Sequence, residues 1–441
     1  MFSQKQLFQL ILPLIGEQFL AVSIGFLDTI MVSSVGEAAV SGVAIVDSIN
    51  VLLIQVFSAL ATGGAVVASQ YIGSGNRDGA CRAAKQLLYS ITFLSTLIMV
   101  FCLAFRSPIL HTVYGDIDPK VMANAEDYFE FTSMSYPFLA IYNAGAALFR
   151  AMGNSKISMF VSLLDNLADI GGNAILIYGC GWGAKGAAVA TLFARIFAAV
   201  VMLYLSCRKT NEIYIDQPFH LMVEFGMIKR ILNIGVPSGL ESGMFQIGKL
   251  IVQRTVTTFG TSAIAANAVA GSISCFSNIP GNAISLALIT VVGQCLGAKD
   301  SDQAVSYTKK LISMAYMAMG LLNIVQFCAA APLVGLYNLE PSALGYAVNI
   351  LHVFSICNAT IWIPSFVLPN ALRAAGDVRF TMLTSAASMW IFRVGFCYIL
   401  TGPLKMGVYG VWYAMYIDWF VRMIIFILRF RSGKWKTKKV I

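Results

Sequence analysis

The chain is a diverged tandem repeat. Residues 13–85 align without a gap on residues 237–309, and 15 of the 73 aligned positions are identical. The identical pairs include Pro13/Pro237, Glu17/Glu241, Gly36/Gly260, Gln70/Gln294, Gly73/Gly297, Asp78/Asp302 and Lys85/Lys309. The separation of the two copies, from Pro13 to Pro237, is far too long for a solenoid, so the repeat predicts two homologous lobes.

Composition places these lobes in a membrane. Apolar residues make up 58% of the chain and charged residues only 12%, which is typical of a membrane protein. Weakly charged runs near the roughly 20 residues needed to cross a bilayer recur throughout. We predict spans at 7–33, 40–71, 87–106, 122–149, 157–180, 184–206, 230–257, 262–296, 311–336, 343–372, 380–402 and 407–430.

The predicted fold is therefore an all-α integral membrane protein with twelve transmembrane helices in two homologous six-helix lobes. A large soluble helical protein is the alternative, but the polar faces that amphipathic helices need are missing. Two homologous lobes in so apolar a chain indicate a transporter built around a central axis. Pro13 and Pro237 are expected to kink the first helix of each lobe.

Other sequence features narrow the class further. The first apolar run is interpreted as a retained helix because it lacks a cleavage site of small residues. The nine cysteines show no CxxC spacing and the three histidines are scattered, so neither a disulfide, a metal site nor a cofactor is expected. The chain is not expected to be an enzyme, and we predict a monomer.

Basic residues predict the orientation. Of 30 Lys and Arg, 21 lie at the N-terminus, in even-numbered loops or in the tail, and only four lie in odd-numbered loops. By the positive-inside rule, both termini are cytoplasmic. The predicted domains are an N-terminal lobe (1–206), a flexible cytoplasmic linker (207–229), a C-terminal lobe (230–430) and a basic tail (431–441) that meets anionic lipid headgroups rather than nucleic acid.

The energy source is expected to be an ion gradient, because no phosphate-binding GxxxxGK[ST] loop is present. Acids within the spans are the candidates for coupling: Glu17, Asp28, Asp47, Asp165, Asp169, Glu241 and Asp418. Asp28 is the strongest candidate, since the repeat aligns it with the apolar Val252 of the second copy. A carboxylate there is costly unless it is protonated or paired with a cation; the alternative is a helix-end acid in the headgroup zone.

A polar stripe marks the fifth span. The i, i+4 spacing places Asp165, Asp169 and Asn173 on one helical face. Such a stripe suits a proton relay or ion coordination, with a sodium site at Asp28 and Asp169 as one form of the latter. The alternative is an interhelical hydrogen-bond seam.

Other polar residues recur in both lobes. Glu17 and Glu241 repeat four residues after a proline, which favours a structural or gating role over a coupling role specific to one lobe. The repeated Gln70 and Gln294 are further substrate or gating candidates. Asp418 and Arg422, at i, i+4, are predicted to neutralise each other, and Lys249 is expected to meet Glu241.

Taken together, these motifs resemble the multidrug and toxic compound extrusion (MATE) transporters over essentially the full length. The motifs that carry the resemblance are Pro13 with Asp28-Thr-Ile-Met, Gln70-Tyr-Ile-Gly73, Phe149-Arg-Ala-Met-Gly153, Leu372-Arg-Ala-Ala-Gly-Asp377 and the Gly183/Gly186 pair. The resemblance implies a V-shaped 6+6 bundle that exports organic cations in exchange for protons or sodium.

The resemblance also implies site residues. The first-helix acid of the family corresponds to Asp28, the prime coupling residue. Many members carry Asn-x-x-x-Asp in the fifth helix, whereas this chain has Asp169-x-x-x-Asn173, with the two side chains exchanged on the same face. Sodium-using members carry further acids in helices seven and ten, but here span 343–372 contains none and helix seven offers only Glu241, near its start. Proton coupling in the N-terminal lobe is therefore favoured over sodium.

Two other functions stay open at this point. A flippase for lipid-linked intermediates, from the same superfamily, would use cations within the membrane, and Arg195, Lys249, Arg254 and Arg393 are available. A passive channel would need no gradient. Small organic cations or drugs, protons or sodium, and membrane lipid are the predicted partners, and nucleic acid is not.

Overall fold

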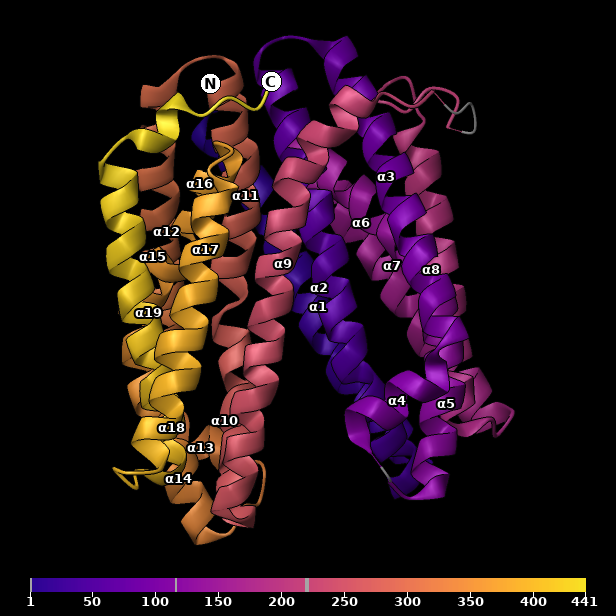
Figure 1. Ribbon diagram of the computed structural model, residues 1–441, viewed down its shortest axis with the longest axis vertical. Coiled ribbons are helices and arrows are strands. Elements are labelled where there is room, and N and C mark those ends of the chain that lie inside the picture. The colour runs from indigo at the N-terminus through magenta and orange to yellow at the C-terminus, as the bar shows by residue number, and fades with distance from the viewer. Residues whose placement is uncertain (1, 116, 219–221) are drawn as a thin grey trace. The chain divides into compact units, whose positions relative to one another are not determined.

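The computed structural model describes residues 2–115, 117–218 and 222–441. Every regular element in these ranges is a helix (Figure 1). The helices form two compact units, an N-terminal unit of residues 3–239 and a C-terminal unit of residues 240–441 with residues 1–2. The prediction of an all-helical chain is confirmed.

The N-terminal unit contains most of the first repeat and the start of the second. Its elements are α1 (Gln4–Ser33), α2 (Glu37–Gly73), α3 (Arg77–Ala104), α4 (Arg106–Tyr114), α5 (Pro119–Met134), α6 (Tyr136–Ala151), α7 (Ser155–Asn173), the π-helix η1 (Ala174–Gly179), α8 (Gly183–Ser206) and the first part of α9 (Phe225–Val256). The division between the units thus falls inside α9, between Gly239 and Leu240.

The C-terminal unit contains the rest of α9 and more interrupted helices. Its elements are η2 (Thr257–Phe259), α10 (Thr261–Ser277), α11 (Ile279–Gly297), α12 (Ser301–Cys328), α13 (Ala330–Gly335), α14 (Pro341–Cys357), η3 (Asn358–Trp362), α15 (Ile363–Phe366), α16 (Leu368–Ala374), α17 (Val378–Ser388), η4 (Met389–Gly395), α18 (Phe396–Thr401), α19 (Gly407–Arg431) and η5 (Lys434–Thr437). Of these, η3 and η4 are π-helices, and η2 and η5 are 3₁₀-helices.

Ten helical segments in the described ranges are long and apolar enough to cross a membrane. They account for all the predicted spans except 122–149 and 230–257. The first of these is divided into α5 and α6 at Ser135, and the second is α9, which is long enough but more polar in composition. Some of the breaks inside predicted spans fall near Pro137, Pro280, Pro364 and Pro369, because proline has no backbone N–H to donate to the preceding turn.

The repeat extends to the details of helix ends. The side chain of Asn76 accepts a hydrogen bond from the Gly79 amide at the start of α3. Asp300, at the equivalent place in the second repeat, caps α12 in the same way through the Gln303 amide. Gly36 and Gly260 have φ angles of +129° and +87°, in the region that favours glycine. Their identity in both repeats therefore has a backbone cause.

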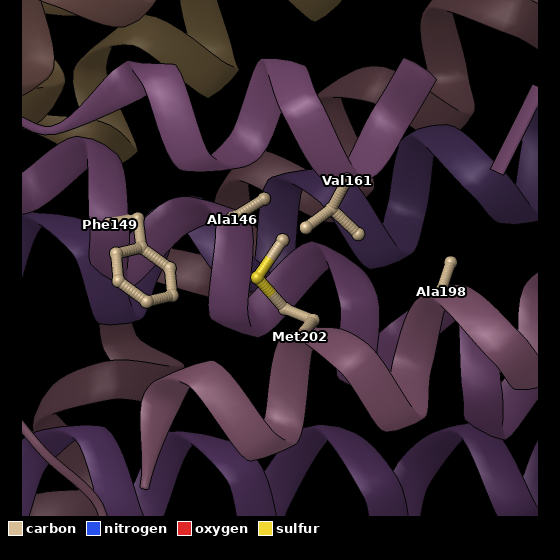
Figure 2. Close-up of a cluster of buried hydrophobic side chains, with 5 residues drawn as sticks. All are labelled: Ala146, Phe149, Val161, Ala198 and Met202. Carbon is tan, nitrogen blue, oxygen red and sulfur yellow. The ribbon is translucent and has the colours of Figure 1, made fainter. Parts of the chain in front are cut away.

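Small residues bring α6, α7 and α8 together in the N-terminal unit. Ala146 and Phe149 from α6, Val161 from α7, and Ala198 and Met202 from α8 form one buried cluster (Figure 2). A Cβ added to Gly145 would lie 2.2 Å from the Met202 Cγ, so the close approach of α6 and α8 requires glycine there. This packing fixes the helices that carry the polar residues described below.

The segment between α8 and α9 is fastened to the N-terminal unit. Arg77 donates to the carbonyls of Asn211 and Glu212, and Gln86 donates to the Met222 carbonyl. These parts of the predicted flexible linker are thus held against α3. Positions 219–221 of the linker lie outside the described residues.

The C-terminal tail packs on its own unit. Trp435 is fully buried, and Lys436 and Lys438 lie 3.2 Å from Asp302 and 3.7 Å from Asp377. The sequence predicted that this tail meets lipid headgroups. For these two lysines, carboxylates of the protein supply counter-charges, and contact of the tail with headgroups stays a prediction.

Candidate ion-coupling site

A row of polar contacts joins α1 to α7 along their lengths. Ser155 donates to the Leu10 carbonyl at 2.5 Å, Asn166 to the Leu20 carbonyl at 3.3 Å and Asn173 to the Asp28 carboxylate at 3.0 Å. The residue numbers rise together on both helices, so α1 and α7 run parallel. That direction agrees with a first and a fifth membrane crossing. The last contact of the row involves Asp28, the strongest coupling candidate.

The predicted site residues of α1 and α7 do come together. Asn173 is fully buried and Asp169 nearly so, whereas Asp28 and Asp165 are half-buried. Asp28 is close enough to Asp169 for direct electrostatic interaction as well as bonding to Asn173. The i, i+4 stripe predicted from the sequence therefore faces the predicted acid of the first helix.

Oxygen atoms dominate the unsatisfied groups at this place. Asp165 Oδ1, Asp169 Oδ1 and Asn173 Oδ1 are buried and have no hydrogen-bond partner among the described residues. Buried acceptors without donors are costly, so a proton or a cation is the species that would complete them. The cluster can thus bind positive charge in an otherwise apolar unit.

Asp47 and Arg195 enlarge the cluster from two other helices. Asp47 on α2 accepts hydrogen bonds from Asn50 and Tyr128, each at 3.3 Å. Arg195 on α8 donates to the Ser135 hydroxyl at 2.7 Å and interacts electrostatically with Asp28, Asp47, Asp165 and Asp169. Four acids and one arginine leave a net negative charge when all are ionised.

Sequence reasoning identified Asp47 only as one of several buried acids and missed Tyr128. It grouped Arg195 with the cations of a possible anion site, whereas the structure places it among carboxylates. The available signal was that an arginine inside a span needs a counter-charge. Which acids supply it depends on helix packing, which no local spacing reveals.

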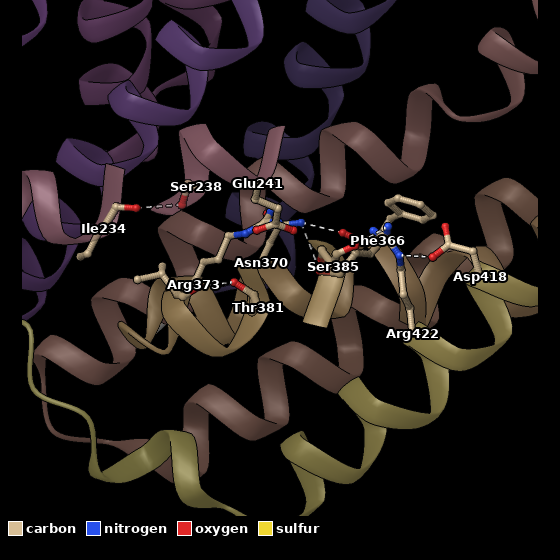
Figure 3. A network of polar contacts seen from close by, with 12 residues as sticks. Ile234, Ser238, Glu241, Phe366, Asn370, Arg373, Thr381, Ser385, Asp418 and Arg422 are labelled. Atoms are coloured by element: carbon tan, nitrogen blue, oxygen red, sulfur yellow. Dashed lines mark hydrogen bonds and ion pairs between the residues drawn. The ribbon is translucent and has the colours of Figure 1, made fainter. Parts of the chain in front are cut away.

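Glu17 and Glu241 occupy equivalent ion pairs. Glu17 accepts from Arg150 and from the Ser158 hydroxyl, both at 2.7 Å. In the C-terminal unit Glu241 accepts from Arg373 at 2.6 Å (Figure 3). Both arginines belong to the repeated Arg-Ala motif, so the repeat encodes both partners of each pair.

This pairing corrects one expectation. Lys249 was predicted to meet Glu241, but the partner of Glu241 is Arg373. The reason is reach across helices: α16 brings the Arg373 guanidinium to α9, whereas Lys249 lies two turns away on the same helix as Glu241. The predicted Asp418–Arg422 pair is confirmed, with 2.8 Å between Arg422 Nε and Asp418 Oδ1.

Gln70 and Gln294 lie in the last turns of α2 and α11, and both side chains are buried. Gln70 lies about 34 Å further along α2 than Asp47, at the usual rise of an α-helix. Gln70 is therefore far from the carboxylate cluster of its own unit. The carbonyls of Gln70 and Gln294 accept from Ser74 and Ala298, which close the two helices in the same way.

Comparison with known proteins gives one family. The model of the family described as MatE matches residues 13–175 and again residues 237–399. Both bounds of the second range are displaced from those of the first by the offset that separates Pro13 from Pro237. The two halves of the chain are thus two matches to the same family model.

Individual relatives span nearly the whole chain. The chain is 26% identical over 437 residues to the "uncharacterized transporter YisQ" of Bacillus subtilis, covering 98% of this chain and 95% of that protein. It is 24% identical over 447 residues to the "probable multidrug resistance protein NorM" of Thermotoga maritima, covering 99% and 94%. A solved structure described as the outward-facing conformation of a multidrug resistance MATE family transporter matches with a TM-score of 0.91, 20% identity and coverage of 98% and 97%.

Proposed function

The chain belongs to the MatE family of membrane transporters, and from this we propose that it is a secondary active antiporter that exports organic cations. The relatives named as multidrug resistance proteins support drugs or organic cations as the substrate class. We further propose that it lies in the cell membrane with both termini in the cytoplasm, on the distribution of Lys and Arg described above, and that it is a monomer.

The observation that carries the proposal is the contact of Asp28 with Asn173 and Asp169. Two carboxylates in one apolar site repel each other, and either a proton or an organic cation relieves that repulsion. A proton and a substrate cation would therefore compete for the same oxygens. Competition of this kind couples inward proton movement to outward cation movement, provided that the site opens to one side at a time.

Proton coupling is preferred to sodium coupling because the site offers neutral hydrogen-bonding neighbours. Asn173 donates to Asp28, and Tyr128 and Asn50 donate to Asp47. Such donors hold a carboxylate in place while leaving another oxygen open to a proton. One unit of charge crossing 100 mV supplies about 2.3 kcal/mol, enough to accumulate a solute about 50-fold.

The flippase alternative is weakened by the position of Arg195. Of the four membrane cations that it required, Arg195 interacts with four acids of the cluster. A guanidinium neutralised in this way is a poor ligand for a pyrophosphate. This observation favours a cation-binding N-terminal unit.

The direct test is efflux of ethidium from energised cells that express the full chain. Asp28→Asn keeps the size of the side chain and removes its charge, and we expect loss of most efflux. Glu37→Gln, an exposed acid at the start of α2, is the matched control and should transport normally. Unchanged efflux in Asp28→Asn would contradict a coupling role for this residue.

Imposed gradients separate the energy sources. Purified protein in vesicles should move ethidium when a proton gradient is imposed alone, and an uncoupler should abolish this movement. Movement driven only by a sodium gradient would replace the proton proposal with sodium antiport. Movement that ignores both gradients would indicate a passive channel instead.

A further inference from the structure

The C-terminal unit carries basic side chains at membrane depth that the cation site does not use. Lys249 lies on α9, Arg393 on the π-helix η4 and Arg422 on α19. Arg422 is fully engaged, because its guanidinium donates to Asp418 at 2.8 Å and to the Ser385 carbonyl at 2.9 Å (Figure 3). Lys249 and Arg393 are different.

Arg393 lies over the ring of Phe245, which precedes Lys249 by about one turn of α9, and the two cations interact electrostatically. Within the described part of the chain, neither has a carboxylate within ion-pair distance. Lys249 is exposed and Arg393 is half-buried. The carboxylate that acts on Arg393 is that of Asp418, which already neutralises Arg422, so positive charge is in excess here. Excess cations are costly within a membrane span and mark a candidate ligand site.

The surroundings of Arg393 hold it in place without neutralising it fully. Its guanidinium carbon lies 5.4 Å from the centre of the Phe245 ring, and the Asp418 charge that acts on it is already bonded to Arg422. A cation over an aromatic face keeps its charge and its remaining donors. Arg393 is therefore positioned rather than paired.

The repeat shows that the charge at this position is inverted between the units. When the two copies are aligned through Pro13 and Pro237, Arg393 corresponds to Asp169, and Cys397 corresponds to Asn173. The acid of the N-terminal cluster is thus replaced by a guanidinium in the same place of the fold. An equivalent position with the opposite charge predicts a ligand group of the opposite charge.

Unsatisfied buried atoms point the same way. On η4 these are Trp390 Nε1 and Arg393 Nε, both of which are obligate donors. In the N-terminal cluster the corresponding atoms are the oxygens of Asp165, Asp169 and Asn173. The unsatisfied atoms of the N-terminal cluster are thus oxygens, whereas those on η4 itself are donors; the neighbouring Asp418, which bonds Arg422, keeps one unsatisfied oxygen, Oδ2.

We propose that Lys249 and Arg393 form an anion-binding site in the C-terminal unit, which takes the carboxylate, sulfonate or phosphate group of an organic anion. The Arg393 fork and the Lys249 ammonium supply charged hydrogen bonds to its oxygens. The site is separate from Asp28 and does not depend on how transport is energised.

The same oxyanion chemistry is available from a soluble organic acid and from a phospholipid headgroup. The experiment uses purified full-length protein in an uncharged detergent, with binding of 5-carboxyfluorescein followed by fluorescence anisotropy. Competition by phosphatidylglycerol, compared with phosphatidylcholine, distinguishes the sources. Displacement by the anionic lipid alone assigns the site to a headgroup, and no displacement by either assigns it to soluble organic anions.

Substitutions test the residues. Lys249→Gln and Arg393→Gln should each weaken binding of the anionic dye roughly tenfold or more, the size expected for loss of a charged hydrogen bond. Arg393→Lys should retain part of the affinity and guards against a folding defect. Arg254→Gln, an exposed basic residue on the same helix as Lys249, is the matched control and should bind normally.

Binding that is absent in the unchanged protein, or unaltered in both Gln variants, would overturn the site. Ethidium binding should be unaffected by Lys249→Gln, and binding of the anionic dye should be unaffected by Asp28→Asn. Failure of the anion site and failure of the proposed cation transport are therefore separate results.

Discussion

At the scale of single residues, the buried acids divide by what neutralises them. Glu17, Glu241 and Asp418 each have an arginine nitrogen within 2.8 Å. Asp28 accepts a hydrogen bond from the Asn173 amide, Asp28 and Asp169 interact with each other, and Arg195 acts on both at longer range. An acid that an adjacent arginine neutralises holds helices together, whereas one without such a partner is available to a proton or a substrate cation.

The Glu241–Arg373 pair offers a stability prediction. Arg373→Met should lower the free energy of unfolding by about 3 kcal/mol, because it leaves a buried carboxylate without its counter-charge. Glu241→Gln should lower the free energy of unfolding by less, because the introduced amide oxygen can still accept a hydrogen bond from Arg373. The Arg373 guanidinium also keeps its hydrogen bond to the Asn370 oxygen. Thermal unfolding in detergent, followed by reaction of a thiol dye with the buried Cys295, measures both. Equal losses in the two variants would contradict this account.

The residue scale also shows what the sequence could and could not predict. The stripe of Asp165, Asp169 and Asn173 follows from helical periodicity alone, and Asp28 stands out as an acid in an apolar run. Tyr128 and Arg195 could not be assigned to the site, because their place there depends on how α5 and α8 pack. The partner of Glu241 was misassigned for the same reason: sequence distance favoured Lys249, while tertiary packing brought Arg373.

At the scale of elements, helix existence was predictable and helix interruption was not. Hydropathy indicated the spans, since it depends on composition over a long window. The π-helices η1, η3 and η4 form where an extra residue is inserted into a helical turn, and such insertions are common at functional sites. Here η1 begins directly after Asn173, and η4 contains Arg393. Composition alone carries no signal for either.

Close packing of two helices gives a prediction at this scale. A Cβ added to Gly63 on α2 would lie 2.6 Å from the Ile231 carbonyl oxygen and 2.7 Å from the Gly235 amide nitrogen, both on α9. Since backbone cannot yield easily, Gly63→Ala should destabilise the protein by about 1–3 kcal/mol, measured as a lower unfolding temperature.

The control for this prediction lies on the same helix pair. A Cβ at Gly239 would meet its nearest neighbour, on Val56 of α2, at 3.6 Å, an ordinary contact. Gly239→Ala should therefore be neutral or slightly stabilising, because alanine favours the helix by about 1 kcal/mol. If the two alanine variants unfold at the same temperature, the close approach of α2 and α9 does not limit stability.

At the scale of the whole molecule, the two repeats share a scaffold and differ in charge. The cap residues Asn76 and Asp300, the turns at Gly36 and Gly260, and the Glu–Arg pairs recur in both units. The positions that would bind ligands do not recur, because Asp28 corresponds to Val252 and Asp169 to Arg393 in the repeat. The two repeats thus share a scaffold, and divergence at a few positions accounts for the two sites of opposite polarity that we propose.

The orientation of the whole chain can be tested with its own cysteines. Cys180 follows η1 and Cys328 ends α12, and both are exposed, in or next to odd-numbered loops. Cys207 follows α8 in the segment between the repeats. If the termini are cytoplasmic, a membrane-impermeant maleimide should label Cys180 and Cys328 in intact cells, and Cys207 only after permeabilisation.

Each cysteine is examined in a variant in which the other eight are replaced by alanine, and ethidium efflux confirms that the variant still works. Burial, and then the carboxylate of Asp216, raise the pKa of the Cys207 thiol. The reactive thiolate at this position therefore becomes more abundant as the pH rises, and labelling should be faster at pH ~8.5 than at pH ~7. Labelling at the higher pH ensures that a weak Cys207 signal reports location rather than protonation. Labelling of Cys207 in intact cells, with Cys180 and Cys328 protected, would show that the termini are outside. It would contradict both the orientation and the direction of transport that we propose.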